Sequence, residues 1–316
     1  MSRMLKTTEN QIVTINLFSD SLVNRWLKFT AVSDKSIATY TTSIKQMFRY
    51  FHDKGISKPT REDLEDWRDM LIDSGKSAST VKLYLTSCKL FFRWLAQEKI
   101  YPNIADNLKS RVKISSEHKK DFLSAEQSRA LLEFSKGKGT VKDLRDRAII
   151  GLMLSAGLRT VEVVRADVKD IRRLNGVCFL FVQGKGRSEK SESVRIAPQV
   201  FSLIQDYLKA RGKVKGNEPL FISTSNRCKG ARLDTQTVRK MIKSDLRGIG
   251  LDSERLTAHS LRHTAATTML LNGARLEQVQ QALRHRQIVT TMIYAHHLER
   301  LKNTAECIAA NAIFGT

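Results

Sequence analysis

The sequence of 316 residues contains no apolar run that approaches the roughly 20 residues needed for a membrane-spanning helix. Its first residues also lack the apolar segment and the small-residue cleavage site of a secretory signal peptide. Only four cysteines occur (Cys88, Cys178, Cys228 and Cys307), and they are too far apart to form a C-x-x-C pair. These absences predict a cytoplasmic protein without membrane contact, disulfide framework or zinc site.

Motifs for nucleotide-dependent and metal-dependent chemistry are missing as well. No glycine-rich nucleotide loop is present, and no set of aspartates and glutamates is spaced for two-metal phosphoryl transfer. His296 and His297 are adjacent, but no cysteine or carboxylate completes a metal-ligand spacing with them. We therefore expect neither a metal ion nor another cofactor.

Acidic residues are scarce relative to basic ones. Thirty-two Asp and Glu stand against 54 Lys and Arg, which leaves a formal net charge of +22 spread along the chain. Solubility alone does not require such an excess. It indicates a polyanionic partner lying across a large surface, most simply duplex DNA, although RNA would satisfy the charge equally well. A membrane surface is disfavoured, because no strongly amphipathic basic helix stands out.

Helical periodicity marks residues 13–100. After a loosely ordered polar tail at 1–12, apolar residues at helical spacing predict four helices that begin near residues 17, 34, 60 and 79. The joins between them are short and polar, and no strand pattern interrupts them. We expect a compact all-helical domain that binds DNA.

Residues 101–121 show no sustained period and are expected to form a linker. The segment is basic, with Lys109, Arg111, Lys113, Lys119 and Lys120. It fits a linker that follows a phosphate backbone, and an ordinary solvated connector is the alternative. A capping box formed by residues 124 and 127 opens the next helix, so a second domain is expected over 122–316.

The second domain is predicted to be mainly helical with one small antiparallel sheet. Extended patterns at 177–182 and 193–196 flank a turn at 183–186 and predict a hairpin. Helices are expected over 141–156, after Thr160 as N-cap, and over 198–211, 235–246, 257–271, 276–285 and 299–313. The last carries a small apolar stripe, which could dock on a neighbouring subunit or fold back on its own domain. The predicted fold is thus mainly α, in two domains.

The segment 257–294 concentrates chemically active side chains. A helical pattern places His259 and Arg262 one turn apart on one face, where both could contact oxygens of one phosphate. A surface pair or a buried structural pair is the alternative, and the adjacent His263 is expected to be structural. His285 ends a second helix, and Tyr294 follows nine residues later. Taken alone, His285 also fits a helix C-terminal cation and Tyr294 a core residue.

Two further candidates lie outside this segment. Arg159 follows the glycine that ends the long helix and lies between apolar helices, where an arginine is an unusual choice unless it points toward an anion in a cleft. Glu162 either supports Arg159 or complements the start of the short helix. Lys185 lies between Gly184 and Gly186 in the hairpin turn, either as a solvated tip or as a mobile cation that protonates a leaving oxygen.

Six residues, in chain order, resemble the catalytic set of the tyrosine recombinase family, which includes phage integrases and the Xer recombinases: Arg159, Lys185, His259, Arg262, His285 and Tyr294. AGLRTVEV resembles the family's first arginine motif, with Glu162 as its acidic residue, and QGKGRSEK resembles its hairpin lysine. TAHSLRHTAATTMLLNG is similar to the His-x-x-Arg helix, and ALRHRQIVTTMIYAH to the segment with the second histidine and the nucleophile. The likeness covers about residues 120–316, and the helical domain before it suits the family's core-binding domain.

One position departs from the family pattern. The family usually has Leu-Gly-His where this chain has Leu283, Arg284 and His285. If the helix end needs a left-handed residue there, the loss of glycine costs about 1 kcal/mol. The change could also reorient His285.

The resemblance implies a site-specific recombinase that cuts and rejoins duplex DNA. Tyr294 would attack the scissile phosphate and displace the 5′-hydroxyl, leaving a 3′-phosphotyrosyl link. The two arginines would bind the non-bridging oxygens, and the hairpin lysine would protonate the leaving oxygen. His259 would exchange the tyrosine proton, with His285 as a hydrogen-bond donor.

The resemblance also implies partners. The family works as a homotetramer on two DNA sites and passes through a Holliday junction, and accessory DNA-bending proteins are further candidate partners. Residues 1–12 are too short for the arm-binding domain of many phage integrases, so we expect a simple Xer-like or transposon-borne enzyme. Two alternatives remain: a type IB topoisomerase, and a non-catalytic DNA-binding or architectural protein on the same fold.

Overall fold

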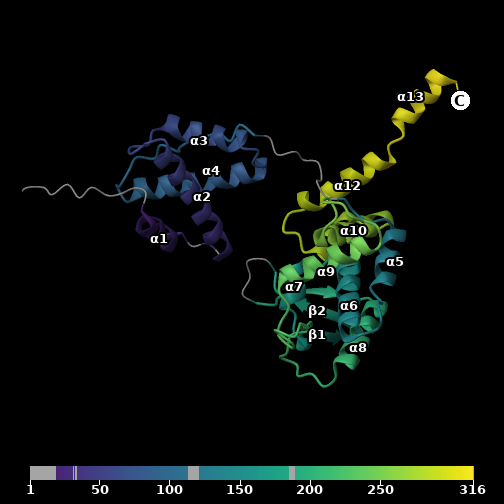
Figure 1. Ribbon diagram of the computed structural model, residues 1–316. Coiled ribbons are helices and arrows are strands. Elements are labelled where there is room, and N and C mark those ends of the chain that lie inside the picture. The colour runs from purple at the N-terminus through teal and green to yellow at the C-terminus, as the bar shows by residue number, and fades with distance from the viewer. Residues whose placement is uncertain (1–18, 31, 33, 113–120, 185–188, 316) are drawn as a thin grey trace, which may run out of the picture. The chain divides into compact units, whose positions relative to one another are not determined.

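A computed structural model describes residues 19–30, 32, 34–112, 121–184 and 189–315 (Figure 1). The chain divides into two compact units, Met1–Ser115 and Ser116–Thr316. The expected tail at 1–12 and four of the predicted site residues, Lys113, Lys119, Lys120 and Lys185, lie outside the described residues. No helix among the described residues is both long enough and apolar enough to cross a membrane.

The first unit is built from four main helices: α1 (Asp20–Phe29), α2 (Asp34–Asp53), α3 (Arg61–Asp73) and α4 (Ala78–Gln97). Side-chain caps at Ser19, Thr60 and Ser77 begin α1, α3 and α4, because each hydroxyl accepts a hydrogen bond from a first-turn amide. The rings of Trp26 and Phe91 meet edge-on in the core, with centroids 5.3 Å apart. The four predicted helices are confirmed, with α1 beginning after its Ser19 cap rather than near residue 17.

The segment that follows α4 belongs to the first unit. Ala105 and Leu108 are fully buried in its core, and the Tyr101 hydroxyl donates a hydrogen bond to the Pro59 carbonyl at 2.7 Å. The prediction of a linker that starts at 101 is therefore wrong for residues 101–112. The segment packs through consecutive turns, which leave no helical or strand period in the sequence.

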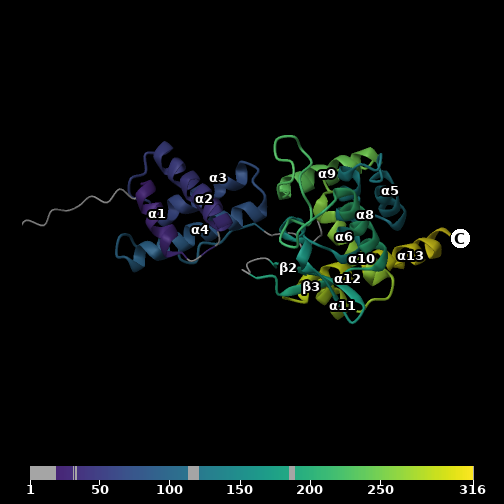
Figure 2. The ribbon, with the colours of Figure 1, turned by 90° about the horizontal axis from the view of Figure 1, so that it is seen from below.

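The second unit contains nine helices within its described residues: α5 (Ala125–Phe134), α6 (Val141–Ala156), α7 (Thr160–Arg165), α8 (Pro198–Arg211), α9 (Thr235–Gly248), α10 (Ala258–Leu271), α11 (Leu276–Leu283), α12 (Val289–Lys302) and α13 (Ala305–Phe314). Helix α6 is central, packed against α5, α8 and α10 (Figure 2). Its residues Ile149, Ile150, Leu152 and Met153 are all buried, because neighbours surround the helix. The predicted capping box at Ser124 is present.

This unit also contains a three-stranded antiparallel sheet, with β1 (Ile171–Leu174), β2 (Val177–Val182) and β3 (Glu192–Arg195) in the order β1-β2-β3. The predicted hairpin pair is confirmed, and alternate residues of β2, including Leu180 and Val182, face the core. Strand β1 was not predicted, because IRRL exposes most of its side chains and shows no apolar alternation. Asn175 and Gly176, both with positive φ, make its tight turn to β2.

Three details of the helices differ from expectation. Arg159 rather than Thr160 occupies the N-cap position of α7. Glu299 lies inside α12, so no helix begins there, and the expected helix 299–313 is two helices separated at Asn303 and Thr304. The reason is local: Asn303 accepts a hydrogen bond from the Ala305 amide through its side chain, which starts a new helix.

Candidate active site

The turn between α6 and α7 lies against the end of α11, and the site is built around this contact. Gly157 ends α6 in the left-handed region, with φ 59° and ψ 35°. A Cβ atom on Gly157 would lie 2.4 Å from Cδ2 of Leu283, which is itself fully buried. Glycine is therefore required at position 157 for two reasons, the left-handed backbone conformation and the close approach of Leu283.

Arg262, in α10, connects the α6–α7 turn to the end of α11. Its side chain is 1% exposed, and its guanidinium donates hydrogen bonds to the carbonyls of Gly157 and Leu283. Burial, together with the neighbouring cations Arg159 and Arg284, lowers the pKa of Arg262 to about 9. The side chain thus keeps its charge near neutral pH and presents a fixed cation.

Arg159 and Glu162 form an ion pair at the start of α7. Nη1 of Arg159 lies 2.8 Å from Oε1 of Glu162, and the Arg159 amide donates to Oε2 of the same carboxylate at 2.8 Å. Burial by itself raises the pKa of Glu162, but the ion pairs with Arg284 and Arg159 and the amide contact outweigh it, so the pKa is below its usual value. Glu162 is fully buried, whereas 26% of the Arg159 side chain is exposed. Arg159 can therefore face an incoming anion while Glu162 cannot.

Arg284 adds a third guanidinium to the same cluster. It caps α11 in the left-handed region, with φ 57° and ψ 45°. Its Nη2 donates to Oε2 of Glu162 at 2.8 Å, its Nη1 donates to the Ala282 carbonyl, and its side chain is 4% exposed. The position does need a left-handed residue, and arginine adopts that conformation while pairing with a carboxylate 122 residues earlier in the chain.

Tyr294 lies in α12 with 5% of its surface exposed. Its ring is stacked on His285, with centroids 6.3 Å apart and planes 10° apart, and it contacts His263 at 5.3 Å. Burial raises the pKa of the phenol, while the charges of Arg262 and Arg159 lower it, and burial prevails. The phenol is thus neutral near pH 7, and the two cations offset only part of the effect of burial on its ionised form.

The two predicted histidines occupy different environments. His285 is half-buried, and its Nδ1 forms a 2.8 Å hydrogen bond with the Thr291 hydroxyl. Burial, followed by the charges of Arg262, Arg159, Arg284 and His259, lowers the pKa of His285 to about 4, so its ring is neutral near pH 7. His259 is exposed in the first turn of α10, and its ring meets that of His263 edge-on at 4.6 Å.

The structure gathers five of the six residues of the predicted set, Arg159, His259, Arg262, His285 and Tyr294, together with Glu162. The sixth, Lys185, lies outside the described residues; in the sequence it follows Gly184, two residues after β2 ends. Sequence reasoning treated Arg284 only as a departure from a pattern and gave no role to Thr291. A charged residue where a glycine is usual was the one available signal for Arg284.

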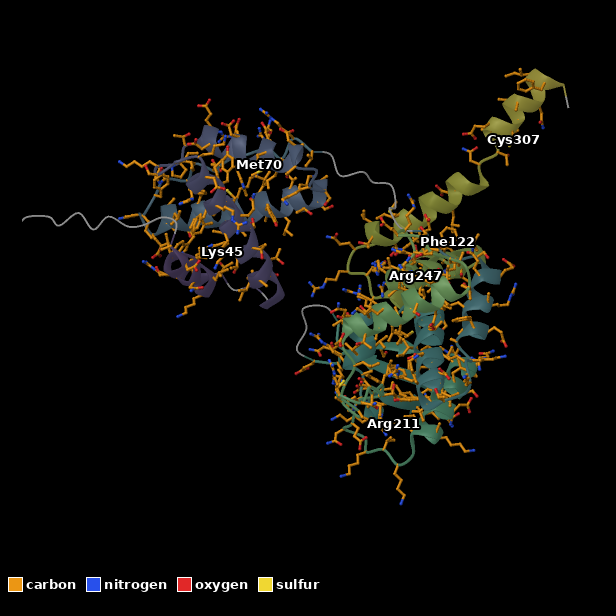
Figure 3. All side chains as sticks on the ribbon, in the orientation of Figure 1. Lys45, Met70, Phe122, Arg211, Arg247 and Cys307 are labelled. Atoms are coloured by element: carbon orange, nitrogen blue, oxygen red, sulfur yellow. The ribbon has the colours of Figure 1, made fainter. Side chains whose placement is uncertain are left out.

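Of the five basic residues expected to follow a phosphate backbone, Lys109 and Arg111 are described. Arg111 pairs with Asp69 at 3.1 Å and with Glu65 at 3.9 Å, and the Lys109 carbonyl accepts a hydrogen bond from Arg68. Basic side chains are spread over the surface of each unit rather than confined to this segment (Figure 3). The charge of the chain is therefore available over a wide area.

Comparisons with known proteins agree with this architecture. The family model of the phage integrase family matches residues 121–300, and that of the phage integrase N-terminal SAM-like domain matches residues 22–101. Tyrosine recombinase XerD of Oceanobacillus iheyensis is 30% identical over 277 residues, covering 84% of this chain and 88% of that protein. Tyrosine recombinase XerD of Yersinia pestis is 30% identical over 304 residues, covering 94% and 97%.

Solved structures share the fold. The XerH site-specific recombinase bound to its palindromic difH substrate, in a post-cleavage complex, gives a TM-score of 0.71 at 24% identity and covers 87% of this chain and 79% of that one. A λ integrase tetramer bound to a Holliday junction gives 0.63 at 18% identity, covering 87% and 76%.

The two-domain helical fold and these relatives define a class, the enzymes that recombine DNA at specific sites. Within it, the chain belongs to the phage integrase family of tyrosine recombinases. The resemblance inferred from the motifs is confirmed, as are the fold class and the activity of a site-specific tyrosine recombinase.

Proposed function

We propose that this recombinase cuts DNA by forming a covalent bond between the Tyr294 oxygen and the 3′ side of the scissile phosphate. The phenolic oxygen attacks phosphorus, the bond from phosphorus to the 5′-oxygen breaks, and that oxygen takes up a proton. The phosphotyrosyl bond conserves the energy of the phosphodiester, so a 5′-hydroxyl from a partner duplex can reseal the strand. The placement of Tyr294 carries the proposal: its ring is stacked on that of His285, and it packs in one apolar cluster with Leu283, whose carbonyl accepts a hydrogen bond from Arg262.

The arginines would stabilise the charge that grows on the non-bridging oxygens in the transition state. Arg262 suits this role because its two carbonyl contacts fix the guanidinium before DNA arrives. Arg159 suits it because its exposed side can meet a phosphate while Glu162 holds the other. Preorganised cations of this kind cost no rearrangement at the moment of reaction.

Proton transfer would involve the two histidines and the hairpin lysine. We assign His259 to the tyrosine proton, because it is exposed and its ring contacts that of His263, which in turn contacts the Tyr294 ring. His285 would act as a neutral hydrogen-bond donor, and for its Nε2 to donate, Thr291 must donate to Nδ1. Lys185 remains our proposed acid for the 5′-oxygen.

The proposed assembly follows that of a related enzyme, because a λ integrase tetramer has been solved on a Holliday junction. We propose that this chain forms a homotetramer on two duplex sites. Accessory DNA-bending proteins are proposed as additional partners, and the cytoplasm as its location. Helix α13 supports this, because it has no buried residue and its Ile308, Ile313 and Phe314 are 67%, 75% and 79% exposed. We propose that these side chains dock on a neighbouring copy.

The test is a duplex nicked next to the cleavage position, taken from DNA that flanks the gene. Wild-type chain and Tyr294→Phe are incubated with it and run on a denaturing gel. The proposal predicts a protein–DNA adduct with wild type and none with Tyr294→Phe, although both bind the DNA. Tight binding with no adduct from either chain would favour the non-catalytic alternative. Relaxation of supercoiled DNA without paired sites would favour the topoisomerase alternative.

A further inference from the structure

Arg284 occupies a position that ordinarily suits glycine, and its contacts indicate why arginine is present. We propose that Arg284 is a positioning residue, the permanent counter-ion of Glu162, which leaves Arg159 aimed at the scissile phosphate with its charge uncompensated. The inference rests on the proposed function and adds a residue to it.

The burial of the two arginines separates their roles. The Arg284 side chain is 4% exposed, and its two terminal nitrogens are both used, on Glu162 and on the Ala282 carbonyl. The Arg159 side chain is 26% exposed and shares the same carboxylate. When a phosphate approaches, Arg159 is the partner that can turn toward it, and Arg284 is the partner that stays. A fully buried carboxylate is thereby never left without a cation.

The charge of the cluster points the same way. Glu162 alone with Arg159 would form a neutral pair, and Arg262 would then be the one remaining cation among these residues. With Arg284 present, the group of Arg159, Glu162 and Arg284 carries one net positive charge beside that of Arg262. A second net cation close to the phosphate strengthens the stabilisation of a dianion-like transition state.

The backbone adds a third observation. Arginine pays a conformational penalty in the left-handed region that glycine would avoid. The buried ion pair offsets this penalty, because Nη2 of Arg284, at the end of α11, donates to Glu162 in α7. The same left-handed turn sets the direction of the chain into His285, whose amide donates to the Gln280 carbonyl at 3.1 Å. Arg284 therefore bears on the positions of both Glu162 and His285.

Three substitutions test the charge and the backbone separately. Arg284→Gln removes the charge but keeps a polar, unbranched side chain, Arg284→Lys keeps the charge, and Arg284→Gly restores backbone freedom. The rate of adduct formation is measured with each full-length variant at saturating nicked duplex. DNA affinity is measured in the Tyr294→Phe background, where no cleavage occurs. Arg129→Gln is the matched control, because Arg129 pairs with Glu126 at 3.0 Å in an exposed position of the same unit.

The proposal predicts that Arg284→Gln and Arg284→Gly slow adduct formation by roughly 10- to 100-fold, as expected when a reacting group is misplaced. DNA affinity is expected to change by less than about threefold, because most affinity comes from other phosphate contacts. Arg284→Lys should recover most of the rate, and Arg129→Gln should match wild type.

Two outcomes would overturn the proposal: wild-type rates with both Arg284→Gln and Arg284→Gly, or a lysine variant as slow as the glutamine variant. If Arg284→Gly does not fold, the comparison of glutamine with lysine decides, since both keep the same backbone. Failure of wild type itself to form an adduct would contradict the proposed function, and this positioning role with it.

Discussion

At the scale of single residues, the site depends on how one buried carboxylate and three arginines share a small space. Glu162 is fully buried between Arg159 and Arg284, and Arg262 holds the two backbone segments beside them. Arg159 and Arg262 could be singled out from the sequence because each lies in a local motif. The partnership of Arg284 with Glu162 could not, because nothing in a linear sequence shows that positions 122 apart are neighbours.

Replacement of Arg262 by lysine tests the double contact of its guanidinium. A single ammonium cannot donate to the Gly157 and Leu283 carbonyls in the same geometry, so one buried acceptor loses its partner. We expect Arg262→Lys to lower the free energy of unfolding by about 1–3 kcal/mol. Adduct formation should slow by about 10²- to 10³-fold, the usual effect of losing a transition-state donor. Thermal unfolding and the nicked-duplex assay measure the two effects, and unchanged values for both would refute the role.

The low pKa of His285 predicts a pH dependence of stability. Above pH 6.5 the ring is neutral in both the folded and the unfolded chain. As the pH falls from about 6.5 toward about 4, only the unfolded chain takes up the proton, so the free energy of unfolding decreases. His285→Gln cannot take up this proton, so between pH 7 and pH 5 it should lose about 1–2 kcal/mol less stability than wild type. Urea unfolding measures both chains at the two pH values. If wild type and His285→Gln lose equal stability between pH 7 and pH 5, the low pKa of His285 is contradicted.

At the scale of elements, the close approach of the α6–α7 turn to α11 builds the site. The sequence predicted that α6 ends at Gly157, because a glycine follows a long apolar helix. It did not predict β1, whose two exposed arginines conceal a strand, nor the division between α12 and α13. In both cases the outcome was decided by tertiary pairing or by one local hydrogen bond, which periodicity does not record.

Substitution of Gly157 by alanine tests this approach. Gly157→Ala incurs the left-handed penalty of about 1 kcal/mol and also drives Cβ against the buried Leu283 side chain, which adds about 1–3 kcal/mol. Gly139→Ala is the control, because Gly139 also has positive φ but nothing lies within 4 Å of its Cβ position. Chemical denaturation should therefore show a larger loss for Gly157→Ala than for Gly139→Ala. Similar losses of stability in the two variants would mean that Leu283 and α11 shift to accommodate the added methyl group, so that the close approach is not required.

At the scale of the whole molecule, composition and structure agree on a two-domain DNA enzyme. The net charge of +22 predicted a polyanionic partner, and the helical first unit and mixed second unit follow the predicted division. The end of the first domain was placed too early, at residue 100, because residues 101–112 pack by turns on its core. Contacts between subunits are harder to predict from a sequence than domains are. The apolar stripe of α13 was the one sequence feature that suggested such a contact.

The exposed apolar residues of α13 predict a defect in assembly rather than in folding. Ile308→Ser combined with Phe314→Ser should change the free energy of unfolding of the isolated chain by less than about 0.5 kcal/mol, because both side chains are already exposed. Recombination of paired sites should fall sharply, while adduct formation on a single nicked duplex should fall less. Sedimentation on DNA would report the loss of tetramers. A large loss of thermal stability would instead show that α13 folds on its own chain.

The central claim is that Tyr294 carries the DNA, and direct identification of the linked residue tests it most sharply. The adduct formed on the nicked duplex is digested with nuclease and trypsin, and the modified peptide is sequenced by mass spectrometry. The peptide expected to carry the nucleotide spans residues 287–300, in which Tyr294 is the one tyrosine. A phosphate on the Tyr294 oxygen is the predicted result. A nucleotide attached to any other residue, from an adduct that wild type demonstrably forms, would contradict the account.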